Sequence, residues 1–204
     1  MLQVKLDRLL IQRRSGVERF LNGPKDLSVD LLSFWQWKGS DLVSNATRGV
    51  VAEYLVALAL HVDVSGVRDE WAAYDLVTPS GIKIEVKSAA FVQSWFQKTF
   101  SVISFRTSKT LAWDPDTNRQ SKTARRQADA YVFALLAHKD KPSVSPLDAS
   151  HWQFYVLATR VLDARTRSQH SITLRTLEKL SGGALKFDEV NQAVENAVKD
   201  QGAN

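Results

Sequence analysis

The chain has 204 residues, 44% of them hydrophobic and 24% charged, which is the composition of an ordinary globular protein with one sizeable core. It contains no cysteine, so disulfides and thiolate metal sites are excluded. The net charge of +5 and the pI of about 9.5 permit a polyanionic partner without proving one. No apolar run reaches the length of a membrane span and the N-terminus carries no secretory pattern, so we expect no membrane association and a cytoplasmic location.

Residues 1–43 are predicted to form a helical N-terminal extension. Leucines recur among basic residues over 2–22, which indicates an amphipathic helix broken near Gly16 and ended by Gly23-Pro24. Residues 27–37 carry Trp35 and Trp37 and predict a second short helix. We favour core packing over base stacking for these tryptophans.

A third helix is predicted from Ser44 or Asn45 to about His61, and Glu53 is its only charged residue between Gly49 and Leu60. A carboxylate on so apolar a helix is costly to bury unless it is paired or bound to a metal. The alternative is a glutamate at the helix edge, paired with Arg48 or solvated. We favour a functional role because the next element along the chain is acidic.

That next element is a predicted β-hairpin over residues 74–87, turning at Pro79-Ser80-Gly81. The pairing places Asp75 opposite Glu85, and strand alternation places Glu85 and Lys87 on one face. Carboxylates this close suit a hard divalent cation. The alternative is a solvated polar face with a cross-strand salt bridge, and the upstream Glu53 shifts the balance away from it.

The remaining elements complete a mixed sheet with helices on its faces. Strands are predicted at 101–105, 130–136 and 152–157, and helices at 159–164, 171–180 and 187–198, with a polar stretch at 106–128 that becomes helical near Ser121. We expect a core over residues 44–164 and a C-terminal helical segment over 165–204 packed on it.

The polar stretch is basic, and it is interpreted either as a solvated loop or as an arm that contacts phosphates. Its basic residues are Arg106, Lys109, Arg119, Lys122, Arg125 and Arg126. Asp114-Pro115-Asp116 resembles the start of a calcium loop, but Arg119 and Arg125 stand where that loop needs glycine and glutamate. The scattered histidines do not predict a zinc site, and no phosphate-binding glycine loop predicts a nucleotide cofactor.

Glu53 on the helix, Asp75 on the first hairpin strand and Glu85-Val86-Lys87 on the second together resemble the PD-(D/E)XK nuclease superfamily. The resemblance covers roughly residues 44–158. It implies a restriction-endonuclease-like mixed α/β fold with an α-β-β-β-α-β core and Mg²⁺-dependent cleavage of phosphodiester bonds, with Mn²⁺ as a substitute. Tyr74 stands where the family name has proline, a position at which members vary.

The resemblance also implies roles for single residues. Asp75, Glu85 and the main-chain carbonyl of Val86 would hold Mg²⁺, with Glu53 completing the site directly, through water or at a second metal. Lys87 would orient the attacking water or neutralise charge at phosphorus. The basic segment would hold the DNA backbone, Gln93 and Gln97 would support the site from behind, and a homodimer would bring two sites to two strands.

Two competing functions remain open at this point. One is a binding module on the same fold that contacts nucleic acid or a protein without cutting, which the basic balance and six tryptophans fit equally well. The other is an unrelated α/β protein whose hairpin carboxylates are only surface decoration. We favour a metal-dependent DNA endonuclease because all four expected polar positions are occupied.

Overall fold

The centre of the molecule is a four-stranded mixed sheet with strand order β3-β4-β8-β9. The structure is a computed structural model and describes residues 6 and 8–199. The strands are β3 (Leu76–Val77), β4 (Lys83–Ala90), β8 (Ala130–Leu136) and β9 (Trp152–Ala158). β4 and β8 are parallel, whereas the other two neighbouring pairs are antiparallel. The predicted mixed α/β class with a central mixed sheet is confirmed.

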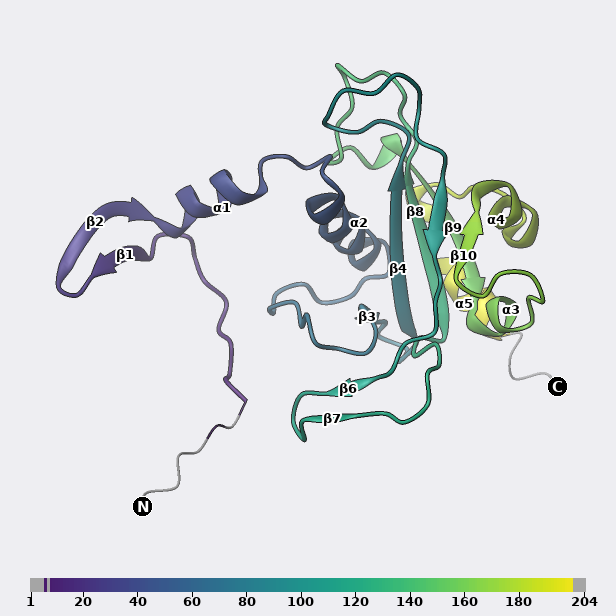
Figure 1. Cartoon of the computed structure of the whole chain (residues 1–204), viewed down its shortest axis with the longest axis horizontal. Coiled ribbons are helices and arrows are strands. Elements are labelled where there is room, and N and C mark those ends of the chain that lie inside the picture. Colours follow the sequence, from purple (N-terminus) through teal and green to yellow (C-terminus); the bar gives the residue numbers. More distant parts are fainter. Residues whose placement is uncertain (1–5, 7, 200–204) are drawn as a thin grey trace.

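β8 is the most deeply buried strand, because layers cover the sheet on both faces (Figure 1). On one face, Val132 and Ile84 pack in a cluster with residues of α2 and α5. On the other face, Phe133 packs in a cluster with Phe105 and Leu177. The continuous apolar run that predicted a strand buried on both sides is explained by these two layers. The covering elements are α2 (Asn45–Ala59), α3 (Thr159–Asp163), α4 (Leu174–Ser181), α5 (Val190–Lys199), β5 (Ser104–Arg106) and β10 (Ser171–Thr173).

α2 begins where the sequence predicts, because the Ser44 hydroxyl caps it by accepting a hydrogen bond from the Thr47 N–H. Ala52 and Val56 are fully buried against the sheet. Glu53 follows Ala52 directly, so the packing of this face fixes where Glu53 emerges beside the sheet.

The hairpin has the predicted register. Leu76 pairs with Ile84 and Val77 with Lys83, which continues to Asp75 opposite Glu85. The N–H of Asp75, the residue just before β3, donates to the Ile84 carbonyl at 3.0 Å. β4 continues to Ala90, three residues further than the predicted hairpin.

The N-terminal extension is not the predicted helix. β1 (Arg19–Asn22) and β2 (Lys25–Asp30) form an antiparallel hairpin, followed by α1 (Leu31–Gly39), and these elements extend away from the sheet (Figure 1). The first part of the predicted helix, residues 2–5 and 7, lies outside the described residues. Within the described part, Gly16 has a φ of +99°, and the Glu18 carboxylate accepts hydrogen bonds from the N–H groups of Ser15 and Gly16. This turn interrupts helical geometry, and Gly23-Pro24 then forms the hairpin turn.

The second predicted helix starts later than expected. The carboxylate of Asp30 accepts from the Ser33 N–H at 2.8 Å and caps α1, so residues 27–30 belong to β2. Trp37 is largely exposed, and no residue of α1 is buried. The prediction that the tryptophans of this helix pack in a core is therefore wrong.

The segment between β4 and β8 differs most from expectation. β5 pairs with β10 in a separate two-stranded sheet, and β6 (Trp113–Asp114) and β7 (Arg119–Gln120) form a hairpin. The predicted helix start near Ser121 is wrong, because the Ser121 hydroxyl instead accepts from the Ala112 N–H across the hairpin base. No helix lies between β4 and β8 in this fully described segment, so the α-β-β-β-α-β order is not reproduced here.

The C-terminal part packs on β9 through α4 and α5. The predicted helix from residue 171 begins only at Leu174, because Ser171–Thr173 pair with β5 and Thr173 then caps α4. Two 3₁₀ turns, η1 (Ala149–His151) and η2 (Phe187–Glu189), precede β9 and α5. Across the described ranges, no helix is both long and apolar enough to span a bilayer.

Candidate active site

Asp75 lies at the open edge of β4, just beyond the short strand β3. Its Oδ2 accepts a hydrogen bond of 2.7 Å from the Val86 N–H. The N–H and C=O of one strand residue point to the same edge, so the Val86 carbonyl faces the edge where Asp75 lies. Because β3 begins only at Leu76, this edge of β4 has room for the Asp75 side chain in place of a paired strand.

Glu85 and Lys87 project from the opposite face of β4 to the one that packs on α2. Ile84 and Val86 are buried among the α2-facing residues, while the Glu85 and Lys87 side chains are 21% and 31% exposed. Lys87 Nζ forms an ion pair with Glu85 Oε1. The predicted sharing of one face by these two residues is confirmed.

Glu53 reaches the same region from α2 and is held by a residue that the sequence did not single out. The Arg68 Nε donates to Glu53 Oε1 at 2.7 Å, and only 9% of the Glu53 side chain is exposed. The expected alternative partner, Arg48, instead bonds to the Val43 carbonyl and to Gln93 and Asn45. Arg68 comes from the connector between α2 and β3, where no pattern indicated a structured arginine.

Two carboxyl groups of this cluster, Glu85 and Glu53, have a raised pKa. Burial, and then the charge of Asp75, raise the pKa of Glu85 against the opposing effect of Lys87. Burial also raises the pKa of Glu53, opposed first by Arg68. The site therefore holds three acids and two cations in a partly desolvated place, which is the kind of perturbed environment that functional sites have.

Two hollows meet at Asp75. One, of about 360 Å³, is lined by Asp75, Glu85 and Lys87 together with basic and aromatic side chains, and we call it the cleft. The other, of about 410 Å³, is mostly apolar and contains Glu53 and Arg68. The further polar and aromatic side chains that line the cleft are Trp71, Arg106, Ser108, Lys109, Thr110, Trp113, Gln127 and Tyr131.

The six predicted phosphate-contacting residues are not all in one place. Arg106 and Lys109 line the cleft beside Glu85 and Lys87. Arg119 and Lys122 are exposed on and after the β6–β7 hairpin, and Arg125 is exposed with its Nε 2.9 Å from Gln127 Oε1. Two of the six thus reach the cleft.

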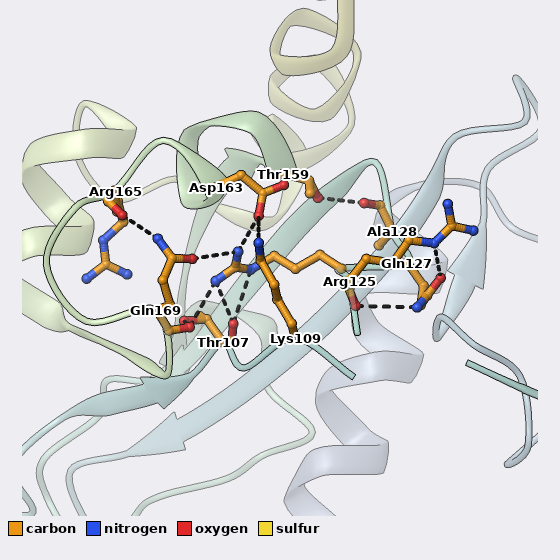
Figure 2. A network of polar contacts seen from close by, with 10 residues as sticks. Thr107, Lys109, Arg125, Gln127, Ala128, Thr159, Asp163, Arg165 and Gln169 are labelled. Carbon is orange, nitrogen blue, oxygen red and sulfur yellow. Dashed lines mark hydrogen bonds and ion pairs between the residues drawn. The ribbon is translucent and has the colours of Figure 1, made fainter. Parts of the chain in front are cut away.

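Arg126 does not have the exposed position expected of a phosphate-contacting residue, because its side chain is fully buried and bonded within the protein. Its guanidinium donates to the carbonyls of Thr107 and Gln169 and forms an ion pair with Asp163. Figure 2 shows this network, which ties the segment after β5 to the end of α3 and to the loop before β10. Arg126 is thus a structural residue. The sequence alone could not distinguish this buried arginine from the exposed Arg125 beside it.

Gln93 and Gln97 were predicted to support the site from behind. The Gln97 side chain accepts from the Gln93 N–H at 2.6 Å, and both amides donate to Ser101. Gln93 also bonds to Arg48 at the start of α2. Their hydrogen bonds fix the loop after β4, and within the described chain none reaches Glu53, Asp75, Glu85 or Lys87.

Sequence reasoning missed the aromatic walls of the cleft. Trp71 and Trp113 come from the connector and from β6, and Tyr131 is the partner of Glu85 in the parallel β4–β8 register. Burial, and then the charge of Glu85, raise the pKa of Tyr131. The parallel register is a long-range feature, so no local pattern could place Tyr131 beside Glu85.

The geometry limits how a metal ion could be held. Among the described residues, no three histidine, aspartate or glutamate side chains are grouped closely enough to hold one ion. Asp75, Glu85 and the Val86 carbonyl remain as oxygen donors near one sheet edge, with Glu53 engaged by Arg68. A set of three direct carboxylate ligands is therefore not supported by this arrangement.

Carboxylates beside a lysine in a cleft with basic walls are the groups expected of an enzyme that acts on a polyanion. The comparison with protein families agrees with this class. The chain belongs to the bacteriophage T4 endonuclease IV family, whose model matches residues 5–176 and so spans every candidate site residue. The comparison with individual curated proteins gave no match. Membership of an endonuclease family supports a nuclease function for this chain.

Proposed function

We propose that the protein is a metal-dependent DNA endonuclease whose active site is of the PD-(D/E)XK type. The observation that carries the proposal is the register of the hairpin, which brings Asp75 and Glu85 opposite each other with Lys87 on the Glu85 face. Family membership supports nuclease chemistry, and the cleft with Arg106 and Lys109 supports a phosphate-bearing substrate.

The donor set fits Mg²⁺ as the cofactor. Magnesium is usually held by one or two carboxylates and keeps several waters, so Asp75 and Glu85 suffice without a third acid. The raised pKa of Glu85, caused by burial and by Asp75, indicates negative charge that a bound cation would offset. Asp75, Glu85 and the Val86 carbonyl would hold the ion, and Mn²⁺ would substitute for it. Bound there, Mg²⁺ supplies Lewis-acid polarisation of a phosphoryl oxygen and makes a water more acidic.

The residues of the chain provide the rest of the mechanism. Lys87, partly exposed at the cleft, neutralises charge that develops on the phosphoryl oxygens or orients the attacking water. Arg106 and Lys109 bind phosphate groups on the cleft wall. Glu53, held by Arg68, contributes negative charge near Asp75 and would act through water or help to hold a second ion.

Cleavage of both strands of a duplex would need two sites, and a homodimer would supply them. This arrangement remains a prediction by analogy with enzymes that cut both strands. Size-exclusion chromatography with light scattering, in the presence and absence of DNA, measures it directly.

Replacing Lys87 with alanine is expected to lower the rate of DNA cleavage by about a hundredfold or more, since removing one preorganised charge-stabilising group has effects of that order. Binding of Mg²⁺ should survive, because the carboxylates remain. The measurement is nicking of supercoiled plasmid in Mg²⁺, together with the Mg²⁺-induced rise in melting temperature.

Lys83→Ala is the matched control, because Lys83 is an exposed lysine of the same strand β4 and contacts the Tyr74 ring outside the cleft. It should cleave at close to the wild-type rate. Wild-type activity in Lys87→Ala would remove Lys87 from the proposed site, and an equal loss in both variants would point to strand damage instead.

A further inference from the structure

A second hollow with basic walls lies in the C-terminal part of the chain. It has a volume of about 700 Å³ and is formed by α3, the loop that follows it and α4. Arg160, Arg165, Arg167 and Lys179 line it, and no acidic side chain does. None of these residues belongs to the predicted basic segment.

Three cations of this hollow, Arg165, Arg167 and Lys179, are only partly neutralised by the described part of the protein. Arg165 Nη2 donates to the Ser171 carbonyl at 3.1 Å, whereas its buried Nη1 has no hydrogen-bond partner among the described residues. Arg167 and Lys179 are exposed, and no ion pair joins either of them to an acid within the described chain. Like charges gathered in a concave surface repel one another unless an anion lies between them.

A chain of polar contacts links the hollow to the cleft. Lys109, which lines the cleft, has its Nζ 3.6 Å from Asp163 Oδ1 at the end of α3. The buried Arg126 binds the same Asp163 and also Gln169, whose side chain in turn bonds to the Arg165 carbonyl (Figure 2). The network therefore fixes the position of the hollow relative to the cleft.

Exposed basic side chains on a protein of pI about 9.5 are usually just solvated. Three features distinguish the basic residues of the hollow from such side chains. The surface they line is concave, no acidic side chain lines it, and a network of hydrogen bonds links it to the cleft. We propose that the hollow binds the phosphate backbone of the same nucleic acid at a distance from the bond that is cut. This inference rests on the proposed nuclease function and extends it to a second contact region.

The test uses the double variant Arg167→Gln/Lys179→Gln in the full chain. Each lost phosphate contact should reduce the slope of log affinity against log salt by about 1, so the double variant should lose about 2. The probe is a fluorescently labelled 30-base-pair duplex, titrated by anisotropy in Ca²⁺ at several salt concentrations. The KM for Mg²⁺-dependent cleavage of the same duplex should rise in parallel.

Lys25→Gln/Lys38→Gln is the matched control, because it removes two positive charges from β2 and α1, which extend away from α3 and α4 (Figure 1). Circular dichroism melts establish that all variants are folded. Suppose that the wild-type enzyme cuts DNA, but the Arg167→Gln/Lys179→Gln variant keeps the wild-type salt slope or loses no more of it than the control does. That result would overturn this inference and leave the proposed nuclease function standing. A folded wild type that neither cuts nor binds DNA would instead overturn the proposed function and the inference with it.

Discussion

Asp75→Asn is expected to reduce Mg²⁺-dependent DNA cleavage by on the order of a thousandfold, since loss of a metal-binding charge removes several kcal/mol of transition-state stabilisation. The asparagine oxygen can still accept the hydrogen bond from the Val86 N–H, so the hairpin should keep its register. The Mg²⁺-induced rise in melting temperature should disappear with the activity. Initial cleavage rates and melting curves across a Mg²⁺ titration measure both effects.

Asp188→Asn is the control for Asp75→Asn. Asp188 is an exposed aspartate in η2, and its replacement removes the same charge. It should cleave DNA at the wild-type rate and keep the stabilisation by Mg²⁺. An Asp75→Asn protein that still cuts DNA at the wild-type rate would show that the carboxylate at the sheet edge is not part of the site.

Arg126→Ala is expected to destabilise the protein by about 3 kcal/mol, because it removes a fully buried side chain and leaves two carbonyls without their donor. The change leaves the Thr107 and Gln169 carbonyls and the Asp163 carboxylate without their common donor. At this chain length, that loss corresponds to a fall in melting temperature of about 10 °C. Thermal melts and urea titrations at neutral pH measure it.

Arg125→Ala is the neighbouring control. Arg125 is exposed, and its side chain bonds only to Gln127 within the described chain, so the expected change in unfolding free energy lies within about 0.5 kcal/mol. Equal melting temperatures for the two alanine variants would contradict the structural role of Arg126. The pair separates two adjacent arginines that sequence patterns treat alike.

The hairpin and the buried strands could be predicted because their signals are local. Pro79-Ser80-Gly81 sets the loop length, which fixes the pairing of Asp75 with Glu85, and alternation then fixes the shared face of Glu85 and Lys87. The Ser44 cap and the apolar run at 130–136 are local signals of the same kind. These elements contain the acidic residues and the lysine of the candidate site.

The surroundings of the site could not be predicted because they depend on long-range contacts. Arg68 acquires its role only when the connector folds back on α2, and Tyr131 only through the parallel register with β4. Arg126 had the composition of a phosphate contact, yet its partners Asp163 and Gln169 are about 40 residues away. Which arginine is buried is decided by such partners and not by the basic run itself.

The wrong prediction of an amphipathic helix near the N-terminus has a different cause. Leucines at helical spacing predict an amphipathic helix only if a surface exists for them to cover. Leu9, Leu10 and Leu21 are largely exposed in the structure, so no packing surface favours a helix there. The turn at Gly16 and the hairpin turn at Gly23 then determine the local conformation.

The most direct test of the proposed function is incubation of closed circular DNA with the wild-type protein, in Mg²⁺ and in excess EDTA. A closed circle has no ends, so its cleavage reports endonuclease activity alone. The account predicts nicked or linear products in Mg²⁺, their absence in EDTA, and restoration by Mn²⁺. Intact circles in both metals although the protein binds DNA, or equal cleavage in EDTA, would contradict a metal-dependent endonuclease.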